Sequence, residues 1–446
     1  MMARLRIAAT AYAMIFIGGG TAPAQDAAAV GWREFIAALK PEATAAGVRP
    51  QIYDAIFAGM GPNCKQPAVY CSGRVGEPPA AHAALRAKGL PETCFKVTQK
   101  EFLRPGEYFD AAMMARLAAH ARELIAGWRA GDGSDWRRLM KIEADSGVDH
   151  RILMALWGRE TDFGRFRLQH NAVQSLASMA FAGAPARKAW ARTQTIAALR
   201  MVSEGHVSLA DMKSSYAGAT GLTQLLPTEY LERGVDGDGD GRVDVWRSAM
   251  DALATTANVL KAEGWSREQR TWGAEARLPE KGGADCTLEG PARRRTLAEW
   301  RSLGVTGGEA GRKGDSPAYI VAPAGARGPV FLATDNFEVL RRYNTSDVYA
   351  AFIGELAQRI GCAKADCGFR RAWPKKGPDD DFAFSVENLC RLQIGLQKRG
   401  FSTVPPDGLF GRGTRIGIGL YQKSRGEQPD CYPTQAIYEA VTGRAP

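Results

Sequence analysis

The spacing of apolar and polar residues along this 446-residue chain predicts a protein built mainly from amphipathic helices. Apolar residues recur at positions three and four apart in several segments, which is the period of one face of a helix. The segments with this pattern are 32–39, 111–130, 136–145, 150–162, 189–204, 250–263 and 347–360. Segment 63–91 is rich in Pro, Gly and Ala and is expected to be a loop.

Two short apolar runs, 318–321 and 329–332, flank a turn that contains Pro and Gly, and they predict a small β-hairpin. The predicted fold class is therefore α+β, mostly α. Segment 369–381 is polar and contains Pro and three successive Asp, so it is predicted to be a linker. The expected divisions of the chain are 1–24, 25–367, 368–383 and 384–446, and the last is long enough only for a small domain.

The first residues have the parts of a secretory signal peptide. Arg4 and Arg6 precede an apolar run at 7–17, and Ala22-Pro23-Ala24 fits a cleavage site. The run is too short and too interrupted by Gly to span a bilayer well. No cysteine follows the site, so lipid anchoring is not expected. We predict a soluble periplasmic protein that begins near Gln25.

Eight cysteines in an exported protein suggest disulfides rather than free thiols. Their connectivity cannot be read from the sequence, although proximity favours some pairs. The favoured pairs are Cys64–Cys71 and Cys362–Cys367, and Cys390–Cys431 would close the last domain. Zinc is disfavoured because no pair has CxxC spacing and the five histidines are scattered.

The net charge of the chain is +10, and removal of Arg4 and Arg6 with the signal leaves 10 − 2 = +8. Such a balance favours an anionic partner, although it also serves simple solubility. The basic residues are dispersed rather than arranged in a stripe, so nucleic acid is not expected as a partner. An anionic cell-wall polymer fits an exported protein better.

One carboxyl group lies where a purely structural carboxylate is unusual. Glu160 follows Leu156 by four residues and Trp157 by three, which places it on the apolar face of the predicted helix 150–162. Burial disfavours the charged form of a carboxylic acid, and a protonated acid can give its proton to a leaving oxygen. The alternative is a structural residue that pairs with Arg159 or Arg165.

An Asp-Gly repeat at 236–244 predicts a calcium loop that resembles an EF-hand. Alternating carboxylates can converge on one cation, and without a cation they would repel one another. The twelfth position is Arg247, which cannot be a ligand, so a later carboxylate must replace it. The predicted ligands are Asp236, Asp238, Asp240, the carbonyl of Arg242, Asp244 and Asp251. The alternative is a solvated turn, and a bound Ca²⁺ would be structural.

Four motifs in this order resemble the lytic murein transglycosylases of the lytic transglycosylase B family. They are Trp-Gly-Arg-Glu-Thr-Asp-Phe-Gly at 157–164, Ser-Ser-Tyr-Ala-Gly-Ala-Thr-Gly-Leu-Thr-Gln at 214–224, the Asp-Gly loop, and Asn-Phe at 336–337 with Arg-Tyr-Asn-Thr-Ser-Asp-Val-Tyr at 342–349. The resemblance covers about residues 32–360. It implies a lysozyme-like catalytic domain at 25–367 with added helical and small β parts.

The resemblance also assigns roles to single residues. Glu160 matches the catalytic glutamate of the family. The residues that match its glycan-binding positions are Ser215, Tyr216 and Gln224 on one side of the cleft and Tyr343, Asn344 and Tyr349 on the other. Without the resemblance, core packing explains Tyr343 and Tyr349 equally well. Gly218 and Gly221 are expected to leave room for a sugar ring.

The end of the chain resembles the small three-helix peptidoglycan-binding domain. Its Asp-Gly-x-Phe-Gly-x-x-Thr signature stands at 407–414, and a generic helical packing domain is the alternative. Gly417 and Gly419 occupy positions where the resemblance expects Ala, and each should weaken the helix by about 1 kcal/mol.

The resemblance implies cleavage of the β-1,4 bond between N-acetylmuramic acid and N-acetylglucosamine, with a 1,6-anhydromuramyl product and no catalytic cofactor. A glycosidase usually needs two carboxylates, but near Glu160 the sequence offers only Asp162, which faces away, and Asp211, which has no motif around it. One acid suffices if the substrate supplies the remaining groups. The alternatives are a muramidase-type hydrolase, a non-catalytic cell-wall-binding protein, and a calcium-dependent adhesin.

Overall fold

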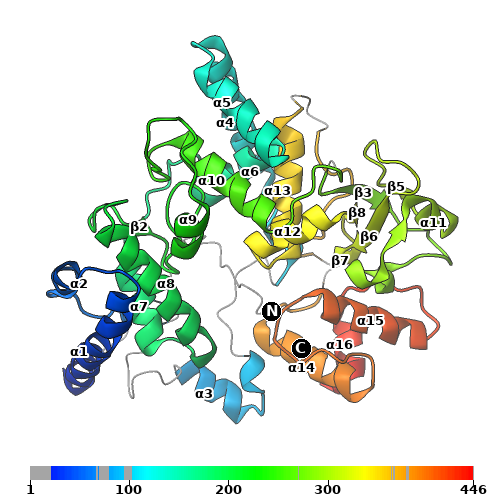
Figure 1. The fold of residues 1–446 in the computed structure, drawn as a ribbon. Helices are drawn as coiled ribbons and strands as arrows, with labels where there is room; N and C mark the ends of the chain where they lie inside the picture. The colour runs from blue at the N-terminus through cyan, green and yellow to red at the C-terminus, as the bar shows by residue number, and fades with distance from the viewer. Residues whose placement is uncertain are drawn as a thin grey trace. The chain divides into compact units, whose positions relative to one another are not determined.

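The computed structural model describes residues 22–66, 69, 80–94, 103–269, 271–362, 364, 367–377 and 381–444 (Figure 1). These residues form two compact units. The first unit holds the described residues between 22 and 83 together with 123–259, and the second holds those between 84 and 122 together with those between 260 and 444. Of the predicted signal peptide 1–24, only the last three residues are described, and they begin the first helix.

The helices of the first part of the chain are α1 (Ala22–Ala45), α2 (Pro50–Phe57), α3 (Ala80–Ala87), α4 (Ala111–Ala130), α5 (Ser134–Ser146), α6 (His150–Thr161), α7 (Ala172–Ala182), α8 (Pro185–Ser203), α9 (Pro227–Arg233) and α10 (Ala249–Ala262). Those that follow are α11 (Leu297–Ser302), α12 (Asp335–Tyr343), α13 (Asp347–Ile360), α14 (Val386–Lys398), α15 (Arg412–Ser424) and α16 (Gln435–Thr442). Within the described ranges, no helix is both long enough and apolar enough to cross a membrane.

The strands are β1 (His170–Asn171), β2 (Lys213–Ser214), β3 (Gly273–Arg277), β4 (Arg295–Thr296), β5 (Thr306–Gly307), β6 (Pro317–Val321), β7 (Pro323–Ala326) and β8 (Val330–Ala333). Short 3-10 turns occur at η1 (Glu92–Cys94), η3 (Pro105–Glu107), η4 (Cys286–Leu288) and η5 (Pro291–Arg293).

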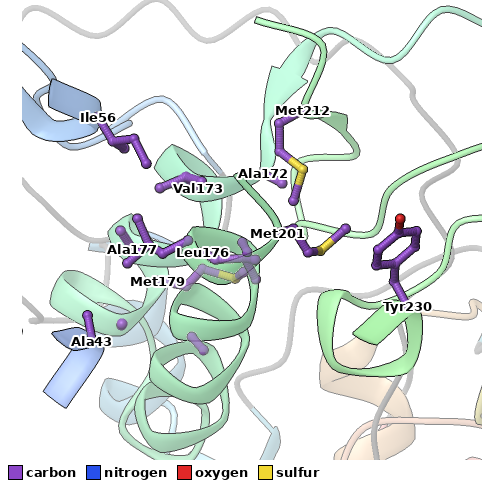
Figure 2. Packing of buried hydrophobic residues seen from close by; sticks show 14 of the residues in the cluster. Ala43, Ile56, Ala172, Val173, Leu176, Ala177, Met179, Met201, Met212 and Tyr230 are labelled. Atoms are coloured by element: carbon purple, nitrogen blue, oxygen red, sulfur yellow. The ribbon is translucent and has the colours of Figure 1, made fainter. Parts of the chain in front are cut away.

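The core of the first unit surrounds α7. Figure 2 shows Val173, Leu176 and Met179 of this helix among apolar side chains that include Met201 of α8 and Tyr230 of α9. Every residue of α7 except the half-buried Gln174 is buried, and most of the buried residues are apolar or small. A helix that is buried all round has no polar face, so the sequence pattern did not predict it.

The second unit contains a sheet with the strand order β4-β6-β8-β3-β5, in which neighbouring strands are antiparallel. The predicted hairpin is confirmed, because β6 pairs with β8 and Tyr319 lies opposite Ala333. Strand β7 lies in the connection between them. The remaining strands were missed because several have only two residues and leave no periodic pattern.

The predicted helices are confirmed, and the bounds of α4 and α13 match the predicted ranges. The expected loop 63–91 is wrong in one part, since residues 80–87 form α3. That stretch is mostly Ala, the residue with the highest helix propensity, and its composition outweighs the Pro and Gly that surround it.

The segment after 384 forms three helices around an apolar core that includes Leu389, Leu396 and Ile418. Its disulfides differ from the expectation. Cys390–Cys431 is wrong, because Cys390 pairs with Cys94 and Cys431 pairs with Cys286. These partners lie 296 and 145 residues apart along the chain, so sequence proximity could not reveal them. Cys362–Cys367 is confirmed. The pair Cys64–Cys71 involves Cys71, which lies outside the described residues.

The segment predicted as a linker packs against other residues of the second unit. Trp373 stacks on Phe109 with ring centres 4.0 Å apart, and Phe369 packs against Phe331. The backbone N–H groups of Arg370 and Arg371 donate to the carboxylate of Glu275 at 2.6 and 2.8 Å. Aromatic residues of this segment therefore find partners far away in the sequence, which the polar composition of the segment did not indicate.

Gly419 of α15 is required for packing rather than being a weak point of the helix. A Cβ at this position would lie 2.4 Å from Cys431 Sγ and 2.6 Å from Thr287 Cγ2. We therefore expect Gly419→Ala to lower the free energy of unfolding by about 1–3 kcal/mol, although Ala is the better helix former. Thermal unfolding measures this effect. Gly127→Ala in α4, where nothing lies within 4 Å of the built Cβ, is the matched control and should stabilise by roughly 0.5–1 kcal/mol. Stabilisation by both substitutions would contradict the packing argument.

Candidate active site

Glu160 lies in the last turn of α6 and is 8% exposed, so its predicted burial is confirmed. The helix begins after Asp149, whose side chain accepts a hydrogen bond from the N–H of Arg151 at 2.8 Å. Leu153 and Leu156 on the same helix are fully buried. The carboxyl group is therefore carried by a helix that is fixed at its start and packed into the core.

The chain reverses sharply directly after Glu160. Asp162, Phe163 and Gly164 have φ angles of 51°, 57° and 81°, a left-handed conformation that is uncommon for residues other than Gly. Gly158 makes this reversal possible, because a Cβ there would lie 2.6 Å from the ring of Phe163. Phe163 in turn packs edge-on against Trp157. Such strained backbone persists only where its surroundings hold it, and it is frequent at functional sites.

Thr161 connects the end of α6 to the segment that carries Ser215 and Gln224. Its hydroxyl donates to the carbonyl of Leu222 at 2.6 Å and accepts from the N–H of Gly164 at 3.1 Å. Leu222 precedes Gln224 by two residues. The first unit therefore joins the residue after Glu160 directly to the second predicted motif.

Segment 214–225 is held in a compact turn by its own hydrogen bonds. The N–H of Ser215 donates to the carbonyl of Ala219 at 2.8 Å, and the Ser215 hydroxyl accepts from the Ala219 N–H at 3.3 Å. Gln224 has a left-handed φ of 58°, and its amide nitrogen donates to Gly221 at 3.0 Å. The amide oxygen of Gln224 is buried and has no hydrogen-bond partner among the described residues. That oxygen is available to a ligand.

The expectation that Gly218 and Gly221 leave room for a sugar ring is wrong. Both have left-handed φ angles, of 85° and 75°. A Cβ at Gly218 would lie 2.4 Å from Leu176, and one at Gly221 would lie 2.8 Å from Val245. The space beside these glycines is occupied by protein side chains, so they let the turn pack on the core rather than leave room for a sugar.

Two polar residues of this region were not predicted from the sequence. The side-chain amide of Gln66 donates to the carbonyl of Tyr216, and its own oxygen is buried without a hydrogen-bond partner among the described residues. The indole N–H of Trp157 is also buried and unpaired within that part of the chain. Trp157 was assigned only to an apolar face, and Gln66 lies in an expected loop. The nearby Cys64 was the one signal that this loop is held in place.

Tyr343, Asn344 and Tyr349 lie together in the second unit, where α12 ends and α13 begins. Both tyrosine rings are buried, as core packing also predicts. Asn344 follows the last residue of α12 and is 1% exposed. Neither polar atom of its side chain has a hydrogen-bond partner among the described residues. A buried amide without partners is costly, so it needs an explanation such as a bound ligand.

The Asp-Gly loop brings three of its predicted ligands together. Carboxylate oxygens of Asp236, Asp238 and Asp251 all lie within 4.8 Å of one another. Asp251, the predicted replacement for the twelfth ligand, lies in the first turn of α10. Arg247 instead forms ion pairs with Asp244 at 3.4 Å and with Asp211 at 3.1 Å.

The other predicted ligands take part in local hydrogen bonds. A carboxylate oxygen of Asp240 accepts from the N–H of Arg242 at 2.9 Å, and one of Asp244 accepts from the N–H of Trp246 at 3.1 Å. Neither is part of the group of three convergent carboxylates. The described geometry therefore supports Asp236, Asp238 and Asp251 more directly than Asp240, Asp244 or the carbonyl of Arg242.

Within this group of three carboxylates, the pKa values of Asp251 and Asp236 are shifted in opposite directions. Burial raises the pKa of Asp251, whose oxygens accept from the N–H groups of Gly237 at 2.8 Å and Asp244 at 2.6 Å. The N–H of Gly241 is the main cause that lowers the pKa of Asp236. A divalent cation would offset both the burial of Asp251 and the mutual repulsion of the carboxylates.

Asp211 was one of two candidates for a second catalytic carboxylate, and it lies in an exposed turn. Its side chain accepts from the hydroxyl of Ser208 at 2.9 Å and forms the ion pair with Arg247. The Ser208 hydroxyl is the main cause that lowers its pKa. These contacts are those of a surface carboxylate rather than of a catalytic base.

Comparison with known proteins places the site in context. Residues 31–358 match the family described as Transglycosylase SLT domain. The chain is 26% identical over 218 residues to membrane-bound lytic murein transglycosylase B of Escherichia coli (strain K12), an alignment that covers 49% of this chain and 58% of that protein. The chain therefore spans little more than half the length of this curated relative.

Solved structures show the same fold over a greater length. SltB3 from Pseudomonas aeruginosa, solved in complex with NAG-NAM-pentapeptide, is 33% identical with a TM-score of 0.73, covering 92% of this chain and 99% of that one. Escherichia coli lytic transglycosylase Slt35, solved in complex with calcium, is 19% identical with a TM-score of 0.53, covering 75% and 93%. These matches confirm the predicted mostly helical α+β fold.

Proposed function

Because this chain belongs to the transglycosylase SLT-domain family, we propose that it is a lytic murein transglycosylase of peptidoglycan. It cleaves the β-1,4 bond between N-acetylmuramic acid and N-acetylglucosamine and forms a 1,6-anhydromuramyl product. The observation that carries this proposal is the position of Glu160. It is a buried carboxyl group at the end of a helix. The left-handed backbone that follows the helix and the hydrogen bond from Thr161 to Leu222 hold this helix end in place.

The reaction needs one protein carboxyl group because the substrate supplies the other reacting groups. Glu160 protonates the bridging oxygen as the bond to C1 breaks, and the muramyl acetamido oxygen stabilises the developing cation. The Glu160 carboxylate then removes the proton from the muramyl C6 hydroxyl, whose oxygen attacks C1. The acid is regenerated and no water is consumed. A muramidase-type hydrolase would need a second carboxylate or an ordered water to attack C1.

Unpaired polar atoms support glycan binding by the predicted motif residues. Gln224 and Asn344 both have buried amide atoms without hydrogen-bond partners in the described structure, and Trp157 has an unpaired indole N–H. Hydroxyl and acetamido groups of a glycan can satisfy such atoms. We assign Ser215, Tyr216, Gln224, Tyr343, Asn344 and Tyr349 to substrate binding.

Asn344→Leu should weaken substrate binding without destabilising the protein. The substitution removes two buried polar atoms that have no partner, so we expect the melting temperature to stay the same or rise, because an apolar group of similar size avoids the cost of burying them unpaired. The KM for soluble glycan fragments should rise by about tenfold or more, as expected for one lost hydrogen bond in a buried site.

Asn336→Leu, in the helix α12 that Asn344 directly follows, is the matched control. Its buried amide accepts from the N–H of Ser266 at 2.8 Å and donates to the Ser266 carbonyl at 2.9 Å. This substitution should therefore lower the melting temperature, because it leaves buried backbone groups unpaired. If Asn344→Leu destabilised the protein as much as Asn336→Leu, the amide of Asn344 would be structural.

The group of three carboxylates at the Asp-Gly loop is proposed to bind a structural Ca²⁺. Three convergent carboxylates, from Asp236, Asp238 and Asp251, fit the oxygen ligands that Ca²⁺ prefers. The distantly related Slt35 was solved in complex with calcium, which agrees with this assignment. The ion would hold the loop that follows α9 against the first turn of α10, within the first unit.

Segment 384–446 is proposed to bind peptidoglycan, with 368–383 connecting it to the catalytic domain 25–367. The signature at 407–414 supports the fold of this segment, since Gln393 donates to Asp407 at 2.8 Å and to Thr414 at 2.8 Å. The protein is proposed to act in the periplasm, where the disulfides would be stable.

Release of soluble fragments from purified sacculi tests the catalytic proposal. The enzyme should clear the suspension and release muropeptides at enzyme concentrations well below that of the substrate. A protein that sediments with sacculi but releases nothing would instead be the non-catalytic cell-wall-binding protein.

A further inference from the structure

A group of six charged side chains, three of them buried and three half-buried, connects the C-terminal segment to the rest of the second unit. Its members are Arg341, Arg412, Arg415, Glu289, Glu338 and Asp347. Three positive and three negative charges balance one another. The proposed chemistry at Glu160 uses none of them, and no motif recognised in the sequence explains the two arginines of α15.

Arg415 is the centre of this charged group. Its side chain is 1% exposed, and its Nε and Nη2 donate to the two carboxylate oxygens of Glu289 at 2.9 and 2.6 Å. Nη2 also donates to Asp347 at 2.6 Å, and Nη1 donates to the carbonyl of Phe410 at 3.1 Å. A fully buried arginine with this many charge-assisted bonds fixes its partners in one arrangement.

Arg412 and Arg341 complete the contacts to Asp347. Arg412 Nη2 lies 3.2 Å from Asp347 and 3.2 Å from Glu338, while Arg341 Nε lies 2.6 Å from Asp347. Burial raises the pKa of Asp347, but the three guanidinium groups outweigh it and hold that pKa well below its usual range. Asp347 is therefore a charged residue that forms ion pairs with both Arg412 and Arg415 of the C-terminal segment.

Asp347 is the first residue of α13 and lies inside the motif that carries Tyr343, Asn344 and Tyr349. The backbone between them is short and internally bonded, because the N–H of Ser346 donates to the carbonyl of Asn344 at 2.7 Å. The hydroxyl of Ser346 accepts from the N–H of Tyr349 at 3.1 Å. A shift of Asp347 would therefore move both the buried Asn344 amide and the start of α13.

We propose that Arg412 and Arg415 of the C-terminal segment are positioning residues for the glycan-binding segment 343–349. The segment 384–446 then contributes to the binding site as well as to any attachment to the wall. This inference rests on the proposed function for its effect on turnover.

Arg415→Met in the full-length protein tests the proposal, since methionine keeps much of the volume and removes the charge. We expect the KM for a small soluble glycan fragment to rise at least tenfold while kcat changes less than threefold. Arg415→Lys should restore part of the loss. Arg425→Met, which removes an exposed ion pair with Glu427 on the same segment, should leave both constants unchanged.

A second variant keeps the test decisive if Arg415→Met folds poorly. Glu289→Met combined with Arg415→Met removes a buried pair together and leaves no uncompensated charge from that pair. It should fold but still show the raised KM, because Asp347 has lost Arg415. A wild-type KM in this stable double variant, or in Arg415→Met, would overturn the proposal.

Hydrogen exchange separates this inference from the proposed function. The backbone amides of 344–349 should exchange at least tenfold faster in Arg415→Met than in the wild type, and at the wild-type rate in Arg425→Met. Unchanged exchange in Arg415→Met would overturn the positioning role even if the protein is active. A wild-type protein that cleaves nothing would refute the proposed function, and the exchange result would still decide the positioning role.

Discussion

Glu160→Gln is expected to lower turnover of peptidoglycan by about 10³-fold or more, because general acid catalysis alone contributes about 10²–10⁴-fold. In the proposed reaction the same group first gives a proton to the leaving oxygen and then removes one from the C6 hydroxyl. Glutamine can do neither, although it occupies nearly the same volume. Release of soluble muropeptides from sacculi under saturating substrate measures the effect.

The control for Glu160→Gln is that folding and binding persist. The variant should keep the melting temperature of the wild type within a few degrees and should still sediment with sacculi. Asp162→Asn, two residues later at the left-handed end of α6, should retain most of the activity. Activity of Glu160→Gln within about tenfold of the wild type would remove Glu160 from the mechanism.

Calcium is expected to raise the melting temperature of the protein by roughly 5–10 °C. A ligand present at 100 times its dissociation constant stabilises the folded state by about 2.7 kcal/mol when it does not bind the unfolded chain. For a unit of this size, each kcal/mol corresponds to roughly 2–4 °C. Thermal unfolding in excess Ca²⁺ and after chelation measures the difference.

Asp236→Asn combined with Asp238→Asn should abolish the calcium-dependent increase, since it removes two of the three convergent carboxylates. Asp145→Asn, which changes an exposed carboxylate of α5 in the same unit, should leave the increase intact. A melting temperature that ignores calcium in the wild-type protein would mean that the loop is a solvated turn.

Local sequence patterns were enough to predict the burial of Glu160 and the place of Asp251 beside the Asp-Gly loop. The apolar face of helix 150–162 placed the carboxyl group in the core, and the structure shows it buried in the last turn of α6. Asp251 was identified as the replacement ligand because Arg247 could not serve, and Asp251 does join Asp236 and Asp238. These features depend on spacing within about fifteen residues, which a single sequence displays.

Features that depend on distant segments could not be predicted in this way. The Cys94–Cys390 and Cys286–Cys431 disulfides and the Arg415–Glu289 pair join residues more than a hundred positions apart. Helix α7 has no polar face, so its burial removed the periodic signal that identifies other helices. The need for glycine at positions 218, 221 and 419 could not be predicted, because it depends on distant side chains that leave no room for a Cβ.

The mass of the released muropeptides tests the central claim most directly. Wild-type protein incubated with purified sacculi should yield fragments that end in 1,6-anhydro-N-acetylmuramic acid, because the C6 hydroxyl of the substrate replaces water. Products of a hydrolase carry one added water, about 18 mass units, and a reducing end that borohydride reduces. Anhydro ends as the main product are the predicted result. Hydrated, reducible ends as the main product would contradict the account and establish a muramidase-type hydrolase.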